Sequence, residues 1–328
     1  MTTKNAPKRK GNECIAGLKS NKLRFRYFRY LQSLVFSTIR KIGIRGIIYK
    51  VFSRFFPRDN NIISACDRIG AYRYLGKYHT AITDAPSTCN ESIIVPSKPK
   101  IWICWLQGFE NAPLIVQKCR DSILKYNSGC EVVLLDDSNI KNYIDIPDYI
   151  VEKHQKGIIH HTQYSDYVRI SLLAKHGGIW IDSTTMLTNN LPDYILNADL
   201  FCFKLQPLGK VVASSWFIAA KPKNPIVLNV LQLFNVYWKH ENKLISYSLI
   251  HLCWTMATTA NDTNRKLWDA VPYMDDVNCK LLQMDLFSPY SESRYNQITS
   301  VSSIHKLTYK FDPEYAQKKD TFYKHIIQ

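Results

Sequence analysis

Residues that favour a flexible or low-complexity chain are scarce in this sequence, which has 12 glycines and 14 prolines among 328 residues. Charged residues make up 21% of the chain and apolar residues 46%. This composition excludes collagen-like and wholly disordered chains, and no internal repeat of the solenoid kind is visible. The length allows one large globular domain or two of ordinary size.

Paired cysteines and long apolar runs are also missing. The nine cysteines are odd in number and none has C-x-x-C spacing, so we expect reduced, buried thiols rather than disulfides or a structural zinc site. The polar, basic N-terminus lacks the apolar segment of a secretory signal, and no run reaches the ~18 apolar residues that span a bilayer. We therefore expect a cytoplasmic protein without a membrane-spanning helix.

Acidic residues are almost absent from the first 58 positions. This segment holds 15 of the 43 Lys and Arg residues and one acid, Glu13, which gives it a net charge of +14, whereas residues 59–328 carry only +2. A nucleic-acid-binding body would show a basic face of its own. The near-neutral body therefore argues against nucleic acid as a partner, and the basicity belongs to an N-terminal arm.

Within this arm, residues 22–56 predict basic amphipathic helical segments. Lys22, Arg26, Arg29 and Arg40 recur at helical spacing on one side, and apolar and aromatic residues lie opposite. This pattern is typical of helices that lie in the interface of an anionic membrane, which is the partner we expect. Two alternatives stay open, namely a helix that packs on the body with its cationic side in water, and contact with nucleic acid.

The chain is accordingly divided into three parts. We expect residues 1–58 to form the partly disordered, membrane-associating arm. We expect residues 59–97, with mixed polar and turn residues, to form a connector, and residues 98–328 to form the globular body.

A strand–helix–strand unit opens the body. Residues 100–106 are a continuous apolar run typical of a buried parallel strand, residues 113–126 have helical spacing, and residues 131–135 predict a second strand. This order implies a right-handed crossover and an α/β sheet. Because ligands bind at the carboxyl ends of the strands in such sheets, we expect Gln107, Gly108 and the Asp136-Asp137 pair at the ligand rim.

A second helix and strand bring charged groups to the same sheet edge. Residues 164–176 predict a helix on which Asp166 and Arg169, three residues apart, share one face. After Gly177-Gly178 comes a short predicted strand, and Asp182 follows its C-terminal end. Carboxylates bind sugar hydroxyls or a divalent cation, and a guanidinium pairs with phosphate or fixes a carboxylate. A surface ion pair would account for Asp166 and Arg169 alone, but not for the whole pattern.

Three segments resemble one known family. The run SDYVRISLLAKHGGIWIDST at 165–184 is similar to the signature of the capsular polysaccharide synthesis proteins, which are related to glycosyltransferase family 32 enzymes with a D-x-D sugar-binding motif. The run IWICWLQGFENAP at 101–113 resembles the first strand and turn of that family, and IHKLTYK at 304–310 resembles a late segment of it.

The resemblance implies a GT-A fold, with a nucleotide-binding mixed sheet flanked by helices, and a nucleotide-sugar as donor. Asp182 corresponds to the first aspartate of the D-x-D motif and is the expected catalytic residue. The residues that the resemblance assigns to nucleotide-sugar binding are Trp105, Gln107, Asp166, Arg169, Gly178, Asp182 and Lys306.

The motif departs from D-x-D at its third position, where Thr184 stands in place of an aspartate. A clamp of two carboxylates is therefore not available from this motif. The resemblance still implies a divalent cation, Mn²⁺ or Mg²⁺, held by Asp182 and His305 together with the diphosphate. In the alternative, Lys306 or Lys310 neutralises the phosphate charge.

The expected function is transfer of a sugar to a growing, lipid-linked capsular or O-antigen (lipopolysaccharide) polysaccharide. The enzyme would be peripheral on the inner face of the bacterial cell membrane. Family 32 relatives retain the anomeric configuration, so we expect a retaining enzyme without a dedicated general base. Two rivals stay open: a toxin-like glycosyltransferase that modifies protein, and an inactive GT-A scaffold in a polysaccharide assembly complex, which Thr184 would suit.

Other candidates have weaker patterns. We interpret His160-His161 as a solvated turn rather than metal ligands, and His251 as a core histidine rather than a base for the acceptor. Trp216 suits a sugar cleft or simple core packing equally well, and Asp275-Asp276 offers carboxylates to the acceptor side.

Overall fold

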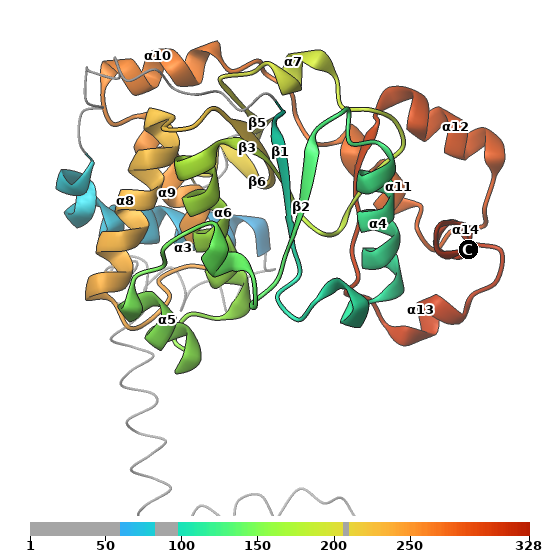
Figure 1. The fold of residues 1–328 in the computed structure, drawn as a ribbon, viewed down its shortest axis with the longest axis horizontal. Coiled ribbons are helices and arrows are strands. Elements are labelled where there is room, and N and C mark those ends of the chain that lie inside the picture. Colours follow the sequence, from blue (N-terminus) through green and yellow to red (C-terminus); the bar gives the residue numbers. More distant parts are fainter. Residues whose placement is uncertain (1–59, 83–97, 206–209) are drawn as a thin grey trace, which may run out of the picture. The chain divides into compact units, whose positions relative to one another are not determined.

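The structure is a computed structural model that describes residues 60–82, 98–205 and 210–328 (Figure 1). It divides the chain into two compact units, Met1–Tyr74 and Leu75–Gln328. The described part of the first unit lies in helix α3 (Asn60–Leu75), which ends at the boundary. The arm predicted at 1–58, with its amphipathic segments at 22–56, lies outside the described residues.

A mixed sheet forms the centre of the second unit. The strands are β1 (Lys100–Cys104), β2 (Glu131–Leu135), β3 (Gly178–Ile181), β4 (Thr185–Leu187), β5 (Leu200–Lys204), β6 (Ala213–Ala220) and β7 (Ile304–Lys306). Five of them follow the order β2-β1-β3-β6-β5, with β1 parallel to β2 and β3 and with β6 antiparallel to β3 and β5. The other two, β4 and β7, form a separate antiparallel ladder.

Helices flank the sheet and complete the second unit. They are η2 (Gly76–Ala81), η3 (Phe109–Asn111), α4 (Leu114–Lys125), η4 (Ile140–Asn142), α5 (Asp148–Gln155), α6 (His161–His176), α7 (Asp193–Leu196), α8 (Pro225–His240), α9 (Leu249–Thr258), α10 (Asp262–Ala270), η5 (Asn278–Lys280), α11 (Leu281–Met284), α12 (Glu292–Val301), α13 (Pro313–Gln317) and α14 (Phe322–Ile327). No helix in the described ranges is long and apolar enough to cross a bilayer. The predicted fold class, an α/β fold with a mixed sheet flanked by helices, is confirmed.

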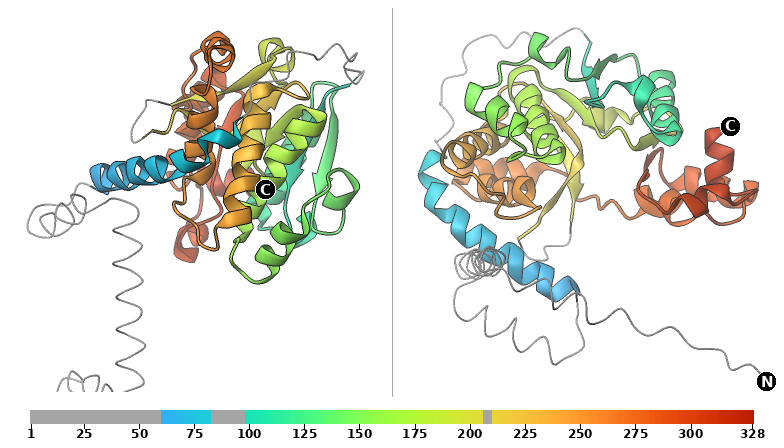
Figure 2. Two further views of the ribbon diagram at one scale, coloured as in Figure 1. Left: turned by 90° about the vertical axis from the view of Figure 1, so that its left-hand side faces the viewer. Right: turned by 90° about the horizontal axis from the view of Figure 1, so that it is seen from below.

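The two faces of the sheet are covered by different helices (Figures 1 and 2). Helices α6, α8 and α9 lie on one face, and α4 and the C-terminal helices lie on the other. Side chains along β1 alternate between the two faces of the sheet. Ile101 and Ile103 join the buried cluster that contains Ile115 and Val116 of α4. Trp102 points the other way and donates its Nε1–H to the carbonyl of Gly177 at the end of α6, at 2.8 Å.

The turn from α6 into β3 depends on two glycines. Gly177 ends the helix with φ +64°, and Gly178 begins the strand with φ +94°. A Cβ atom on Gly177 would lie 2.5 Å from the backbone N of Pro222, and one on Gly178 would lie 2.4 Å from the carbonyl O of Lys100. Only glycine allows both the conformation and the close approach, and the turn sends β3 alongside β1.

Sequence predictions for the first half of the body agree with the structure. The apolar run at 100–106 contains β1, the helical spacing at 113–126 contains α4, and β2 spans the predicted 131–135 in parallel with β1. The seven cysteines in the described ranges are free and six of them are buried, as expected. Residues 76–81, which the sequence assigns to the connector, form η2. From there the Tyr78 hydroxyl donates at 2.7 Å to the carboxylate of Glu241, the residue that follows α8. The three-part division itself stays a prediction.

Candidate active site

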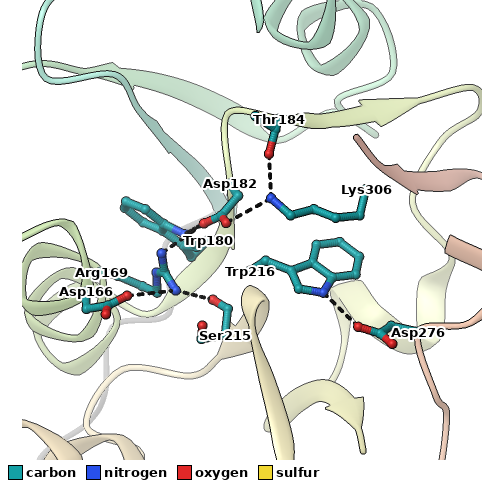
Figure 3. A network of polar contacts seen from close by, with 9 residues as sticks. All are labelled: Asp166, Arg169, Trp180, Asp182, Thr184, Ser215, Trp216, Asp276 and Lys306. Atoms are coloured by element: carbon teal, nitrogen blue, oxygen red, sulfur yellow. Dashed lines mark hydrogen bonds and ion pairs between the residues drawn. The ribbon is translucent and has the colours of Figure 1, made fainter. Parts of the chain in front are cut away.

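The site is centred on Asp182, the residue that follows β3 (Figure 3). Its backbone N–H donates to the carbonyl of Trp216 at 2.8 Å, which continues the pairing of β3 with β6. Its own carbonyl accepts from Thr185 N at 2.9 Å in the turn that leads to β4. The backbone thus fixes this carboxylate at the carboxyl end of a central strand, where the sequence predicted it.

Both oxygens of the Asp182 carboxylate are engaged (Figure 3). Oδ1 accepts from Arg169 Nη2 at 2.9 Å and from Trp180 Nε1 at 2.9 Å, and Oδ2 accepts from Lys306 Nζ at 3.1 Å. Burial acts to raise the pKa of Asp182, but Lys306 and Arg169 outweigh it and hold the pKa below its ordinary value. The carboxylate is therefore ionised and paired with two cations.

Lys306 reaches the site from the two-stranded ladder. It pairs with Thr185 in the β4–β7 register, and its Nζ donates to Thr184 Oγ1 at 2.5 Å as well as to Asp182. The ammonium also lies 5.9 Å from the ring centroid of Trp216. It thus sits between the side chains at the first and third positions of the Asp182-Ser183-Thr184 motif (Figure 3).

Arg169 joins α6 to the strand ends. Its Nη1 donates to the carbonyl of Ser215 at 2.5 Å and lies 3.3 Å from Asp166 Oδ1, and its guanidinium lies 4.9 Å from the Trp180 ring centroid. Asp166 is 6% exposed and does not line the cavity. Burial raises the pKa of Asp166 to about 6, with Arg169 opposing the rise and Asp182 adding to it. Asp166 therefore contacts Arg169 on the side away from the cavity.

An open cavity of about 640 Å³ lies in front of these residues. This volume is within the range usual for small-molecule sites. Trp105 and Tyr309 meet edge to face at 5.2 Å on its wall, and Tyr247 is 71% exposed on its lining. The polar and charged side chains along it include Gln107, Asn111, His161, Thr162, Ser165, Arg169, Asp182, Ser183, Thr184, Gln283, Lys306, Thr308 and Lys310.

Five of the predicted binding residues meet in this cavity, namely Trp105, Gln107, Arg169, Asp182 and Lys306. The segments 101–113, 165–184 and 304–310 are far apart in the sequence, so the fold brings together the three runs that carry the family resemblance.

Gly178 does not belong to the cavity, contrary to the sequence prediction. It stands at the amino end of β3, whereas Asp182 follows the carboxyl end of that strand. Its close approach to Lys100 O explains why a glycine is required there. Its role is in packing β3 against β1.

His305 does not reach Asp182 either, which corrects its assignment as a metal ligand. It is fully buried, and its Nε2 lies 3.0 Å from Thr188 Oγ1. Neighbouring side chains on a strand point to opposite faces, so Lys306 faces the cavity and His305 faces the interior. Burial lowers the pKa of His305 to about 4, and the ring is neutral at pH 7.

The donor set at Asp182 does not suit the divalent cation that the sequence led us to expect. Mn²⁺ and Mg²⁺ prefer several oxygen ligands, carboxylates in particular. Asp182 is the one acidic residue among the described residues that line the cavity, and both its oxygens are taken by cations or by Trp180. Within the described ranges, no three His, Cys, Asp or Glu residues are grouped to hold a metal ion.

The sequence interpretation missed several cavity residues. His161, which the sequence pattern places in a solvated turn, begins α6 and lines the cavity. Tyr309 could have been found, because it lies within the 304–310 run, whereas Tyr247 had no local signal. Trp216 is buried, stacks on Phe203 at 4.9 Å and donates to Asp276 at 3.1 Å, which favours the core-packing alternative.

Two proteins with similar sequences are named as glycosyltransferases. "Uncharacterized glycosyltransferase L373" of Acanthamoeba polyphaga mimivirus is 29% identical over 127 residues, which cover 37% of this chain and 49% of that protein. "O-glycosyltransferase braB" of Annulohypoxylon truncatum is 25% identical over 264 residues, which cover 71% of this chain and 60% of that protein. The matches thus span less than two thirds of the length of these relatives.

Solved structures of glycosyltransferases are more distant. "PaToxG Glycosyltransferase" gives a TM-score of 0.35 at 15% identity, over 80% of this chain and 95% of that one. Glycosyltransferase GlyE of Streptococcus pneumoniae TIGR4 gives a TM-score of 0.36 at 12% identity, over 71% of this chain and 62% of that one.

The match to a protein family covers far more of the chain. Residues 70–326 match the family described as capsular polysaccharide synthesis protein. This range includes the whole sheet and every residue that lines the cavity. The chain belongs to the capsular polysaccharide synthesis protein family.

Proposed function

We propose that this protein is a glycosyltransferase that takes its sugar from a nucleotide-sugar donor. The observation that carries the proposal is the pair of cations, Arg169 and Lys306, that meet at Asp182 on the wall of an open cavity. The family to which the chain belongs makes polysaccharide, and both named relatives are called glycosyltransferases. A cationic cavity at a strand end suits a nucleoside diphosphate.

The cavity offers a matching surface for each part of such a donor. Lys306 and Lys310 supply positive charge for the diphosphate, and Trp105 and Tyr309 supply aromatic surface for a base or a sugar ring. Gln107 and Asn111 add amide groups that can bind hydroxyls. Positive charge and aromatic surface together therefore favour a nucleotide-sugar as the donor.

The proposed reaction is a displacement at the anomeric carbon. The bond from that carbon to the diphosphate oxygen breaks, a bond to the acceptor oxygen forms, and the acceptor proton leaves to the released diphosphate or to water. The protein positions the reactants and stabilises the charge on the leaving group. We propose retention of configuration, because Asp182 is held by Arg169 and Lys306 and is not free to act as a general base.

The acceptor we propose is a growing capsular or O-antigen polysaccharide, linked to lipid at the inner face of the cell membrane. The support is the family's name and the +14 charge of residues 1–58. The full chain should sediment with vesicles of phosphatidylglycerol at low salt and be released by high salt. Equal binding to phosphatidylcholine vesicles, or none to either, would remove the electrostatic part of this proposal.

A thermal-shift screen tests the donor class. The full chain is heated with UDP, GDP, CDP and dTDP and with their sugars, each in EDTA and in Mn²⁺. A ligand at one hundred times its dissociation constant should add about 2.7 kcal/mol to the free energy of unfolding. We expect one nucleotide family to stabilise the protein. A folded protein that responds to none of them would favour the scaffold alternative.

A further inference from the structure

The ammonium of Lys306 occupies a defined place in the motif. It lies 3.1 Å from Asp182 Oδ2 and 2.5 Å from Thr184 Oγ1, the side chains at the first and third positions of Asp182-Ser183-Thr184. The β4–β7 ladder fixes it there, because Thr185 and Lys306 are paired residues. With an aspartate at position 184, two carboxylates would face this same point, and a divalent cation could sit between them. Here a lysine and a threonine take the places of the cation and of the second carboxylate.

The charges around this point disfavour a metal ion. Asp182 contributes one negative charge, and Arg169 and Lys306 contribute two positive charges at 2.9 and 3.1 Å from its oxygens. A divalent cation would have to displace these contacts and would face their repulsion at short range. A phosphate group has the opposite charge and needs the N–H donors that the Lys306 ammonium offers.

We propose that the Lys306 ammonium takes the place of a divalent cation and binds the diphosphate of the nucleotide-sugar directly, so that this protein binds its donor without metal. The inference rests on the proposed function and goes beyond it, since it names the group that neutralises the leaving diphosphate. Lys306 is then a catalytic residue, and Arg169 is a positioning residue that holds Asp182.

Side chains of this protein can supply the positive charge that the leaving diphosphate needs. As the bond between the anomeric carbon and the diphosphate oxygen breaks, the electron pair stays on that oxygen. The ammonium of Lys306 is a fixed positive charge on the cavity wall to which that oxygen can be bound, and Lys310 lies along the same cavity. Asp182 and Thr184 keep the ammonium in place before the donor arrives, so little reorganisation is needed when the charge develops.

The first experiment measures nucleotide affinity of the full chain by calorimetry, in EDTA and then in 5-fold steps of Mn²⁺ or Mg²⁺ up to roughly millimolar concentration. We expect the preferred nucleoside diphosphate to bind with the same Kd, within about 3-fold, in both conditions. Affinity that rises about 10-fold or more with metal would overturn the role of Lys306 and leave the proposed function standing. No nucleotide binding in either condition would overturn the proposed function itself.

The second experiment changes the charge at position 306. Lys306→Met should weaken nucleotide binding in EDTA by about 10-fold or more, and Lys306→Arg should keep most of it because the charge remains. Lys324→Met, on α14 and outside the cavity, is the matched control and should bind as the unaltered protein does. If folded Lys306→Met binds nucleotide in EDTA as tightly as the control, the proposal is wrong.

Discussion

Arg169 and Asp182 lie thirteen residues apart, on α6 and at the end of β3, and their side chains meet at 2.9 Å. The same guanidinium lies 3.3 Å from Asp166 Oδ1 and donates to the carbonyl of Ser215 beside β3. Arg169 therefore ties one helix to two strands while it sets the charge of the cavity wall. Its structural and electrostatic roles can be separated by measurement.

Removal of Arg169 should cost stability as well as ligand binding. Arg169 and Asp166 have side chains only 6% and 9% exposed, so Arg169→Ala leaves a buried carboxylate without its cation. Loss of one partner of a buried pair costs about 3–5 kcal/mol of the free energy of unfolding. Urea unfolding monitored by tryptophan fluorescence measures this loss.

A matched control for that variant is Arg294→Ala. Arg294 pairs with Asp285 at 2.7 Å, but its side chain is 44% exposed. Exposed pairs contribute about 1 kcal/mol or less, so the control should unfold close to the unaltered protein. Equal losses of unfolding free energy in the two variants would show that the buried Asp166–Arg169 pair stabilises the protein no more than an exposed pair does.

The buried carboxyl of Asp166 should make stability depend on pH. Its pKa is about 6 in the folded protein and has an ordinary value of 3.8. Between these values the folded protein binds more protons than the unfolded chain, so the free energy of unfolding falls as pH rises from about 4 to 6. At pH 7 the free energy of unfolding is therefore about 3 kcal/mol lower than it would be if this carboxyl kept its ordinary pKa in the folded protein.

Comparison with Asp166→Asn isolates this contribution, since the amide does not titrate. The difference in unfolding free energy between the two proteins should shift in favour of Asp166→Asn as pH rises from 4 to 7. Carbon-13 NMR of the labelled carboxyl should give a midpoint near the raised value. A parallel pH dependence in the two proteins would mean that Asp166 titrates normally in the folded state.

The elements that carry the site could be predicted from short sequence patterns. The apolar run of β1, the helical spacing of α4 and the Gly177-Gly178 turn each depend on neighbours in the chain, so local physical rules suffice for them. The pairing of Asp166 with Arg169 likewise follows from helical spacing and is present at 3.3 Å. How far each side chain is buried does not follow from this spacing. Tertiary packing decides that Arg169 reaches the cavity and that Asp166 does not.

The assignments that failed depend on long-range packing. His305 and Lys306 are neighbours on β7, and either could face the cavity until the pairing of β7 with β4 sets the alternation. Lys306 then meets Asp182 across 124 positions of sequence. The resemblance assigns Gly178 to the binding site because it lies in the signature, but the nearby backbone of β1 explains why a glycine is required there. Similarity of a segment therefore indicates where the candidate site lies, whereas the roles proposed for individual residues depend on the fold.

Gly178→Ala provides a test of that packing role. An alanine there would keep an unfavourable φ of +94° and place its Cβ 2.4 Å from Lys100 O, so β3 must shift away from β1. Strain and overpacking together should cost about 2–4 kcal/mol of the free energy of unfolding. Gly76→Ala is the control, since no atom lies within 4 Å of its added Cβ, and it should change stability by less than about 0.5 kcal/mol.

Folded Gly178→Ala should bind nucleotide as the control does, because Gly178 stands at the amino end of β3 and Asp182 follows the carboxyl end. Lost affinity without lost stability would instead return Gly178 to the binding site.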